Sequence, residues 1–268
     1  MLKTLVHPDT GQTFKMGRLR PAAPAPRLAF GDYVYKSMPP PPDAVDYSQA
    51  PDPIAMDILG NGENGNCTIA GAFHIEGVLL ANAGQPLPAG LNSANCVSLY
   101  YKLTGGQDTG LDEQTVLNYW QSNGLLADGT CKIAGSCAVD ATNWQEVCTA
   151  LWLFENLYFG AEMPTAWLEP FPHSSGFIWD AAGDPDPNNG HCFIGDAYTQ
   201  GGVKNDTWGL AGVVTPAAIA KYCIPSAYGT LYTVLSQDAI NRATQKAPNG
   251  FDFPTLRSNL NSVSAQPW

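Results

Sequence analysis

One cysteine of this chain stands where a thiol can become a nucleophile. Cys67 follows the turn-like run Gly60-Asn61-Gly62-Glu63-Asn64-Gly65-Asn66 and opens an apolar stretch with helical spacing. The first turn of a helix presents unpaired N–H groups and a partial positive charge, which stabilise a thiolate relative to a thiol. Because the glycines let a substrate approach the backbone closely, the segment predicts a thiol that attacks a carbonyl carbon.

Two later segments carry a base and a group that could orient it. His191 begins the strand-like run Gly190-His191-Cys192-Phe193-Ile194-Gly195, and Asn205 and Asp206 lie about fifteen residues further on. A histidine can take the proton of the thiol, and Asp206 or Asn205 would accept its other ring N–H and fix its tautomer. Only one of two neighbours on a strand can face the histidine, so both assignments stay open. A cysteine, a distant histidine and then Asn/Asp is the order expected of thiol-dependent acyl transfer.

The turn before Cys67 also offers a candidate oxyanion donor. The amide of Asn61, together with the backbone N–H of Cys67, could stabilise a developing oxyanion; one such donor contributes about 3–4 kcal/mol. The alternative is a turn asparagine that bonds its own backbone. Gly65, Asn66 and Gly190 flank the reactive residues and are the candidate substrate-binding positions, and Asn66 is also a candidate N-cap.

Other polar residues fit simpler roles. His74 shares a helix face with Cys67 but lies about 10 Å along the helix axis, so we interpret it as a core or supporting residue. Asp112 and Glu113 are adjacent acids at an expected helix start, where acids are usually partners of the helix dipole. The close-set Cys/His pairs of a zinc finger are missing, so no metal or other cofactor is expected.

The composition narrows the class of partner. The 268 residues carry a net charge of −11 and a pI near 4.6, which argues against nucleic acid. The N-terminus does not resemble a secretory signal, and no run of about 18 apolar residues predicts a membrane span, so a cytoplasmic location is the default expectation. Seven cysteines leave at least one unpaired; most are expected to be reduced, although a disulfide between Cys131 and Cys137 would close a short loop.

Helical patterns precede strand patterns along the chain, which predicts an α+β fold. Residues 1–50 form an expected extended, proline-rich arm, residues 51–240 the catalytic domain, and residues 241–268 a polar extension. The region from 237 onwards is expected to hold one short helix and an irregular tail. Helices are expected at 67–83, 92–102, 112–122, 143–150 and 216–222. Strands are expected at 138–139, 157–164, 191–198, 202–208 and 229–235.

Taken together, the three reactive segments resemble the papain-like cysteine peptidase superfamily. The run ending in Cys67 is similar to its Asn-Gln-Gly-x-x-Gly-x-Cys, with Asn61 at the glutamine; His191 heads a similar strand; Asp206-Thr207-Trp208-Gly209 is similar to Asn-Ser-Trp-Gly. The resemblance implies a two-lobed fold, with a helical lobe carrying the cysteine and an antiparallel β lobe carrying the histidine. It also implies hydrolysis of a peptide or protein substrate through an acyl-enzyme on Cys67. The alternatives are a non-catalytic binding or structural protein, and a cysteine acyltransferase or deamidase.

Overall fold

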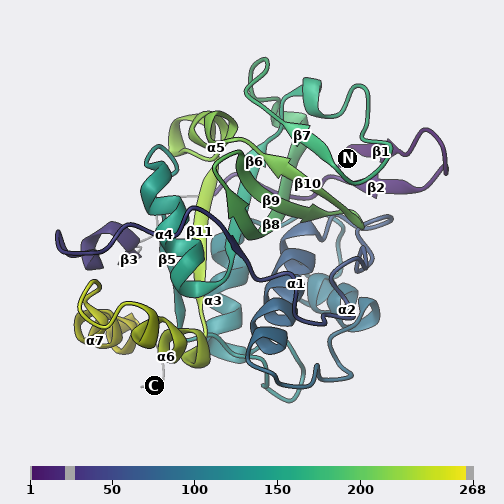
Figure 1. The fold of residues 1–268 in the computed structure, drawn as a ribbon. Coiled ribbons are helices and arrows are strands. Elements are labelled where there is room, and N and C mark those ends of the chain that lie inside the picture. The colour runs from purple at the N-terminus through teal and green to yellow at the C-terminus, as the bar shows by residue number, and fades with distance from the viewer. Residues whose placement is uncertain (1, 22–27, 264–268) are drawn as a thin grey trace.

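Helices and a large mixed sheet share one buried core in this chain. A computed structural model describes residues 2–21 and 28–263. Figure 1 shows α1 and α2 below the strands β8, β9 and β10, with α6 and α7 at the opposite side of the molecule. The α-helices of the described residues are α1 (Cys67–Asn82), α2 (Ser93–Leu103), α3 (Glu113–Asn123), α4 (Trp144–Phe154), α5 (Pro216–Tyr222), α6 (Gln237–Lys246) and α7 (Phe253–Val263).

Within the described residues, nine strands form one sheet and two form a hairpin. The hairpin pairs β1 (Thr4–Val6) with β2 (Thr13–Lys15). Along the sheet the order is β3-β5-β11-β6-β8-β9-β10-β7, and β4 also pairs with β8. Neighbours are antiparallel except β3 with β5 and β10 with β7. The sheet strands are β3 (Leu28–Ala29), β4 (Val45–Asp46), β5 (Gly135–Ala138), β6 (Leu157–Glu162), β7 (Phe177–Trp179), β8 (Gly190–Thr199), β9 (Gly202–Thr207), β10 (Leu210–Val214) and β11 (Thr230–Leu235).

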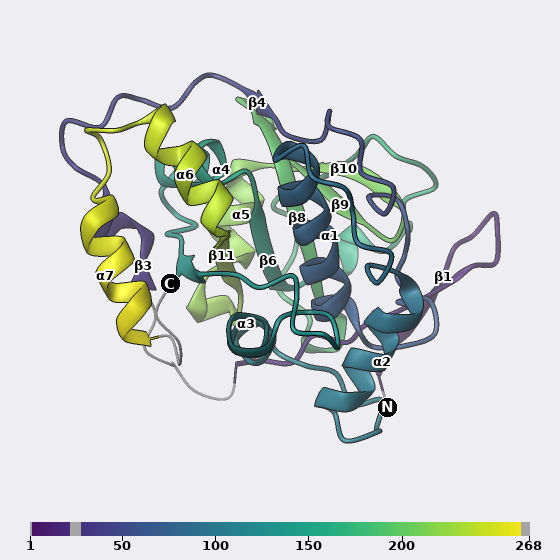
Figure 2. The ribbon, with the colours of Figure 1, turned by 90° about the horizontal axis from the view of Figure 1, so that it is seen from below.

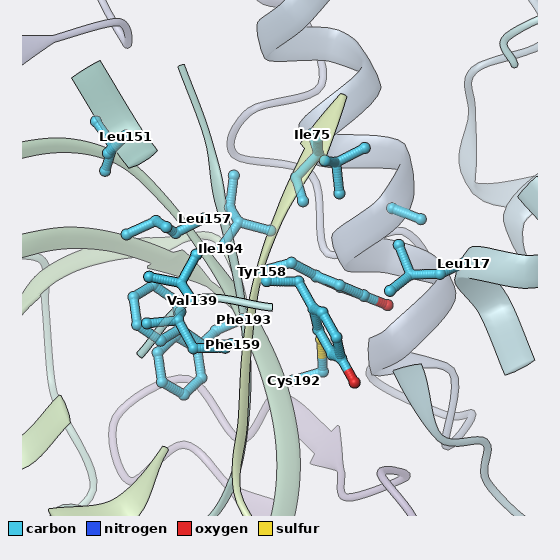
Figure 3. Close-up of a cluster of buried hydrophobic side chains, with 14 of the residues drawn as sticks. Ile75, Leu117, Val139, Leu151, Leu157, Tyr158, Phe159, Cys192, Phe193 and Ile194 are labelled. Carbon is cyan, nitrogen blue, oxygen red and sulfur yellow. The ribbon is translucent and has the colours of Figure 1, made fainter. Parts of the chain in front are cut away.

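Helix α1 is the central element of the core. It lies along β8 (Figure 2), and its residues 67–79 are buried on every side. A helix buried all round needs no polar face, which explains its run of apolar and small residues. In Figure 3, Tyr158 of β6 and Cys192 of β8 lie together beside α1. The Tyr158 hydroxyl donates to the carbonyl oxygen of Thr68 at 2.5 Å, which ties the start of α1 to the sheet.

Side-chain caps fix where most helices begin. Asn92, Asp112, Asn143, Thr215 and Ser236 each accept a hydrogen bond from a backbone N–H in the first turn of their helix. Such a cap contributes about 1 kcal/mol to stability. The first four caps lie within one residue of a helix start that the sequence predicts. The cap expected at the start of α1 is wrong in detail: Asn66 precedes the helix, but its side chain makes no capping hydrogen bond.

The structure confirms the α+β class and corrects the ends of the chain. Strand β10 was not expected, and the region after 237, expected to hold one short helix and an irregular tail, contains two helices, α6 and α7. Of the expected proline-rich arm, Pro24 and Pro26 lie outside the described residues, as do positions 264–268 of the polar extension. All seven cysteines are described and all are free thiols, so the loop from Cys131 to Cys137 is not closed by a disulfide. No helix among the described residues is long and apolar enough to cross a membrane.

A buried carboxyl on α1 gives the fold a pH-dependent stability. Burial raises the pKa of Glu76 to about 7, and its Oε2 has no hydrogen-bond partner among the described residues. Between pH 4.5 and 7 the folded chain keeps this carboxyl protonated while the unfolded chain ionises it, so stability falls as pH rises through that window. We expect the free energy of unfolding of Glu76→Gln to exceed that of the wild type at pH 8 by up to about 3 kcal/mol. Near pH 4.5 the variant should show no gain in stability.

Urea unfolding at pH 4.5, 6 and 8 measures this difference. Glu63→Gln, at an exposed carboxyl in the turn before Cys67, is the matched control and should show no such pH dependence. A gain from Glu76→Gln that is equal at all three pH values would contradict the assignment.

Candidate active site

Residues from separate elements meet around one small cavity. Cys67 from the start of α1, His191 from β8 and Asn61 from the preceding turn all line it. Its volume is about 20 Å³, room for about one water molecule. The structure therefore brings together the thiol, the imidazole and the amide that the sequence singles out.

The Cys67 thiol is buried and protonated in this arrangement. Burial raises its pKa to about 12. The backbone N–H groups of Cys192 and Gly17, and the charge of Arg18, act in the opposite direction because they favour a thiolate. The groups that would stabilise the thiolate are in place, and the exclusion of water outweighs them.

The ring of His191 is held by a hydroxyl and an indole. Its Nε2 lies 2.7 Å from Oγ1 of Thr207, and its ring stacks on Trp208 with centroids 4.1 Å apart. Its Nδ1 has no hydrogen-bond partner within the described part of the chain. Burial lowers the pKa of His191 to about 3, so the imidazole is neutral. One ring nitrogen is thus fixed, and the other is left to exchange a proton.

Asp206 is near the histidine but does not hold it. It lines the cavity, and its Oδ2 accepts from Nζ of Lys204 at 3.1 Å. Alternation along β9 explains this, because residues 204 and 206 share one side of the strand and 205 and 207 the other. Asn205, the second candidate, is buried with no side-chain hydrogen bond among the described residues. The contact expected of Asp206 or Asn205 is made by Thr207.

His74 occupies the supporting position that the sequence favours. It lines the same cavity, and its Nε2 lies 2.8 Å from the carbonyl oxygen of Asp57. Burial lowers its pKa, so it is a neutral residue that ties α1 to the preceding loop.

The side-chain amide of Asn61 is hydrogen-bonded on both its nitrogen and its oxygen. Its Nδ2 donates to the carbonyl oxygens of Lys15 and Asn64, each at 2.9 Å. Its Oδ1 accepts from the Trp208 indole at 2.9 Å, which sets the orientation of the amide. Both N–H groups of the amide are therefore occupied: one binds the backbone of its own turn, as the alternative interpretation predicts, and the other binds the carbonyl oxygen of Lys15. The oxyanion role of Asn61 stays a prediction.

A stretch of the N-terminal region covers the site; we call residues 15–20 the covering segment. The N–H groups of Gly17 and Arg18 donate to the carbonyl oxygen of Gly190 at 3.2 and 3.1 Å. On the other side, Gly17 accepts from the N–H of Leu111, and Leu19 donates to the carbonyl of Leu111, both at 2.9 Å. The covering segment is thus hydrogen-bonded on both sides as an extended chain, next to the thiol.

The glycines around the covering segment make this close approach possible. A Cβ on Gly17 would overlap the backbone of Gly65, and a Cβ on Gly190 would overlap the carbonyl oxygen of Arg18. Gly65 and Gly190 therefore contact the extended backbone of the covering segment, and their role in binding a substrate stays a prediction. The structure places Asn66 elsewhere: its amide donates to Leu59 and Cys96, inside the core.

Solved structures decide the fold. Xylellain, a cysteine protease from Xylella fastidiosa, superposes with a TM-score of 0.64 over 88% of this chain and 99% of its own, at 12% identity. This is the papain-like fold. Digestive procathepsins L2 and L3 from Tenebrio molitor larval midgut share the papain-like fold, with TM-scores of 0.57 and 0.54 at 10% and 12% identity. The two superpositions cover 83% and 81% of this chain, and 78% and 76% of the procathepsin chains. No protein-family model and no curated protein sequence matches the chain.

Four residues that lie next to the thiol or the imidazole were not identified from the sequence. Thr207 stands beside the predicted Asp206, and alternation alone does not tell which side of the strand faces His191. Gly17 and Arg18 come from a region with no periodic pattern, so nothing local indicated that they reach the thiol. The backbone N–H of Cys192 carries no sequence signal at all.

Proposed function

We propose that the chain is a cysteine protease-like hydrolase that cleaves a peptide bond through an acyl-enzyme on Cys67. The observation that carries the proposal is the convergence of thiol, imidazole and amide at one cavity, with Nδ1 of His191 free of any partner among the described residues. Support also comes from the extended peptide that already lies across the site. Gly65 and Gly190 would contact the substrate backbone as they contact the covering segment.

The proposed reaction needs no group beyond the chain and water. His191 takes the proton of Cys67, and the thiolate attacks the carbonyl carbon of the substrate while the Asn61 amide and backbone N–H groups stabilise the oxyanion. The C–N bond breaks, and the imidazolium returns the proton to the leaving amine. A water, deprotonated by His191, then attacks the thioester, releases the acid and restores the thiol.

The orienting role is divided in this proposal between Thr207 and Asp206. Thr207 holds Nε2 of the neutral imidazole in the covered form. Asp206 lines the same cavity and would stabilise the imidazolium once it forms, because an opposite charge nearby favours the protonated ring.

Alkylation resolved by site tests the proposal. Iodoacetamide is applied from pH 5 to 9, and mass spectrometry measures the rate at each of the seven cysteines in the intact chain and in a variant whose covering segment is displaced. We expect Cys67 to react slowly in the intact chain and fastest of the seven once uncovered, with hydrolysis of a denatured protein substrate appearing in parallel. Transfer to an amine in place of water would identify an acyltransferase. An uncovered Cys67 that stays inert would favour a non-catalytic binding protein.

A further inference from the structure

The side chain of Arg18 fills a closed pocket beside the thiol. Both partners of its ion pair are fully buried: Nε donates to Oε1 of Glu113 at 2.6 Å, and Nη2 lies 3.4 Å from Oγ1 of Thr230. Gly160 of β6 provides the room, because a Cβ there would overlap the Glu113 carboxylate and the Arg18 guanidinium. The pocket is thus shaped for a planar cation at the end of a long side chain.

Elements outside the covering segment build this pocket. Glu113 is the first residue of α3, directly after its capping residue Asp112, and Thr230 opens β11. Glu113 does lie in the first turn of α3, where an acid favours the helix dipole, but its side chain is fully buried and pairs with Arg18. We expect these elements to keep their places when the covering segment leaves, which would leave Glu113 as a buried carboxylate without a cation.

The pocket and the thiol are electrostatic neighbours. Glu113 raises and Arg18 lowers the pKa of Cys67, and both act on Cys192, whose N–H donates to the thiol. A peptide that places a guanidinium in this pocket would therefore run its backbone past the sulfur of Cys67, as the covering segment does.

The rest of the covering segment follows the same charge pattern. Lys15 pairs with Asp108, and Arg20 pairs with Glu162, with Nη2 to Oε2 at 3.0 Å, and its guanidinium lies over the Tyr228 ring. A basic peptide thus lies against acidic residues, in a chain of net charge −11 that attracts basic ligands.

We propose that the pocket of Glu113 is a subsite for an arginine side chain of the substrate, which Arg18 occupies from within the chain. The proposal rests on the proposed function. It also accounts for the incomplete pairing: Nη1 of Arg18 and Oε2 of Glu113 have no hydrogen-bond partner in the described ranges, whereas a permanent buried pair is stabilised by satisfying such atoms.

Peptide binding to the full chain carrying Cys67→Ala and Gly17→Val tests this without any chemistry at the thiol. The probes are acetyl-Gly-Arg-Gly-Gly amide and its citrulline analogue, which has nearly the same shape but no charge. We expect the arginine peptide to bind at least about tenfold more tightly by calorimetry, since hydrogen bonds between charged groups are the stronger ones. In the same chain with Glu113→Gln, the two peptides should bind alike.

Each outcome decides one question. Equal binding of the two peptides to the chain that retains Glu113 would overturn the subsite and leave Arg18–Glu113 as a structural pair; this comparison holds even if Glu113→Gln fails to fold. An arginine preference that persists in a folded Glu113→Gln chain would also overturn it. Arginine-selective binding without any hydrolysis by the Cys67-containing chain would retain the subsite and reject the hydrolase.

Discussion

Replacing Gly17 by valine should raise the alkylation rate of Cys67 by about 100- to 1,000-fold near neutral pH. A Cβ at this position would overlap the backbone of Gly65, which cannot rotate away as a side-chain end could. The covering segment would leave, water would reach the thiol, and its pKa would fall from about 12 towards the ordinary value near 8.5. Because the thiolate is the reacting species, its fraction sets the rate.

The other six cysteines serve as internal controls for this experiment. If valine unfolded the chain, buried thiols such as Cys96 and Cys192 would become reactive together with Cys67. Gly201→Ala is the matched control, since a Cβ there meets only Oγ1 of Thr199 at an ordinary 3.4 Å. Hydrogen exchange at the Leu111 amide, which donates to Gly17, reports whether the segment has left. Fast exchange there with an unchanged alkylation rate at Cys67 would contradict the role assigned to the covering segment.

Removing the imidazole of His191 from the uncovered chain should lower peptide hydrolysis by about 10²- to 10⁴-fold. The expected loss is that of a general base and acid that acts in both halves of an acyl-enzyme reaction. The apparent pKa of Cys67, read from alkylation against pH, should rise because the imidazolium partner is gone. The measurement compares Gly17→Val with the double variant Gly17→Val/His191→Ala, using Cys67→Ala in the same background as the blank. Hydrolysis that survives without His191 at an undiminished rate would exclude the mechanism.

Two companion variants separate the residues that orient His191. Thr207→Val removes the hydroxyl that holds Nε2 at 2.7 Å and keeps the volume nearly constant. Asp206→Asn removes the cavity-lining charge and keeps the shape. If Thr207→Val causes the larger loss of hydrolysis, the ring keeps its present partner during the reaction. If Asp206→Asn causes the larger loss, the carboxylate is what stabilises the imidazolium, as the sequence predicts.

The local parts of the fold were predictable because their causes are local. Capping residues and apolar spacing placed α2, α3 and α4 within one or two residues of their observed starts. The one short helix expected after residue 237 fits α6, whose Ala239, Ile240 and Ala243 form a buried stripe against α4. Helix α7 was missed although its Phe253, Leu256 and Leu260 are buried.

The residues of the candidate site also fall into those that a local pattern predicts and those that it does not. The glycine-rich turn, the helix start and the strand start located Asn61, Cys67 and His191, because each carries its own local pattern. Thr207 could not be separated from its neighbours, since a strand pattern tells which residues share a side but not which side faces a distant histidine. The partnership of Arg18 with Glu113 joins residues 95 positions apart, and no local rule specifies such a contact.

The covering segment is joined to the fold at both ends, by β2 before it and by β3 after it. Its binding is therefore intramolecular, with an effective concentration that short tethers set on the order of millimolar. Dilution cannot uncover the thiol of an intact chain, and a free peptide has to compete at comparable concentration. Cleavage of the chain after Arg20 would make the binding of the covering segment bimolecular. The same contacts would then hold a separate fragment, and the fraction of molecules with a covered thiol would fall as the protein is diluted.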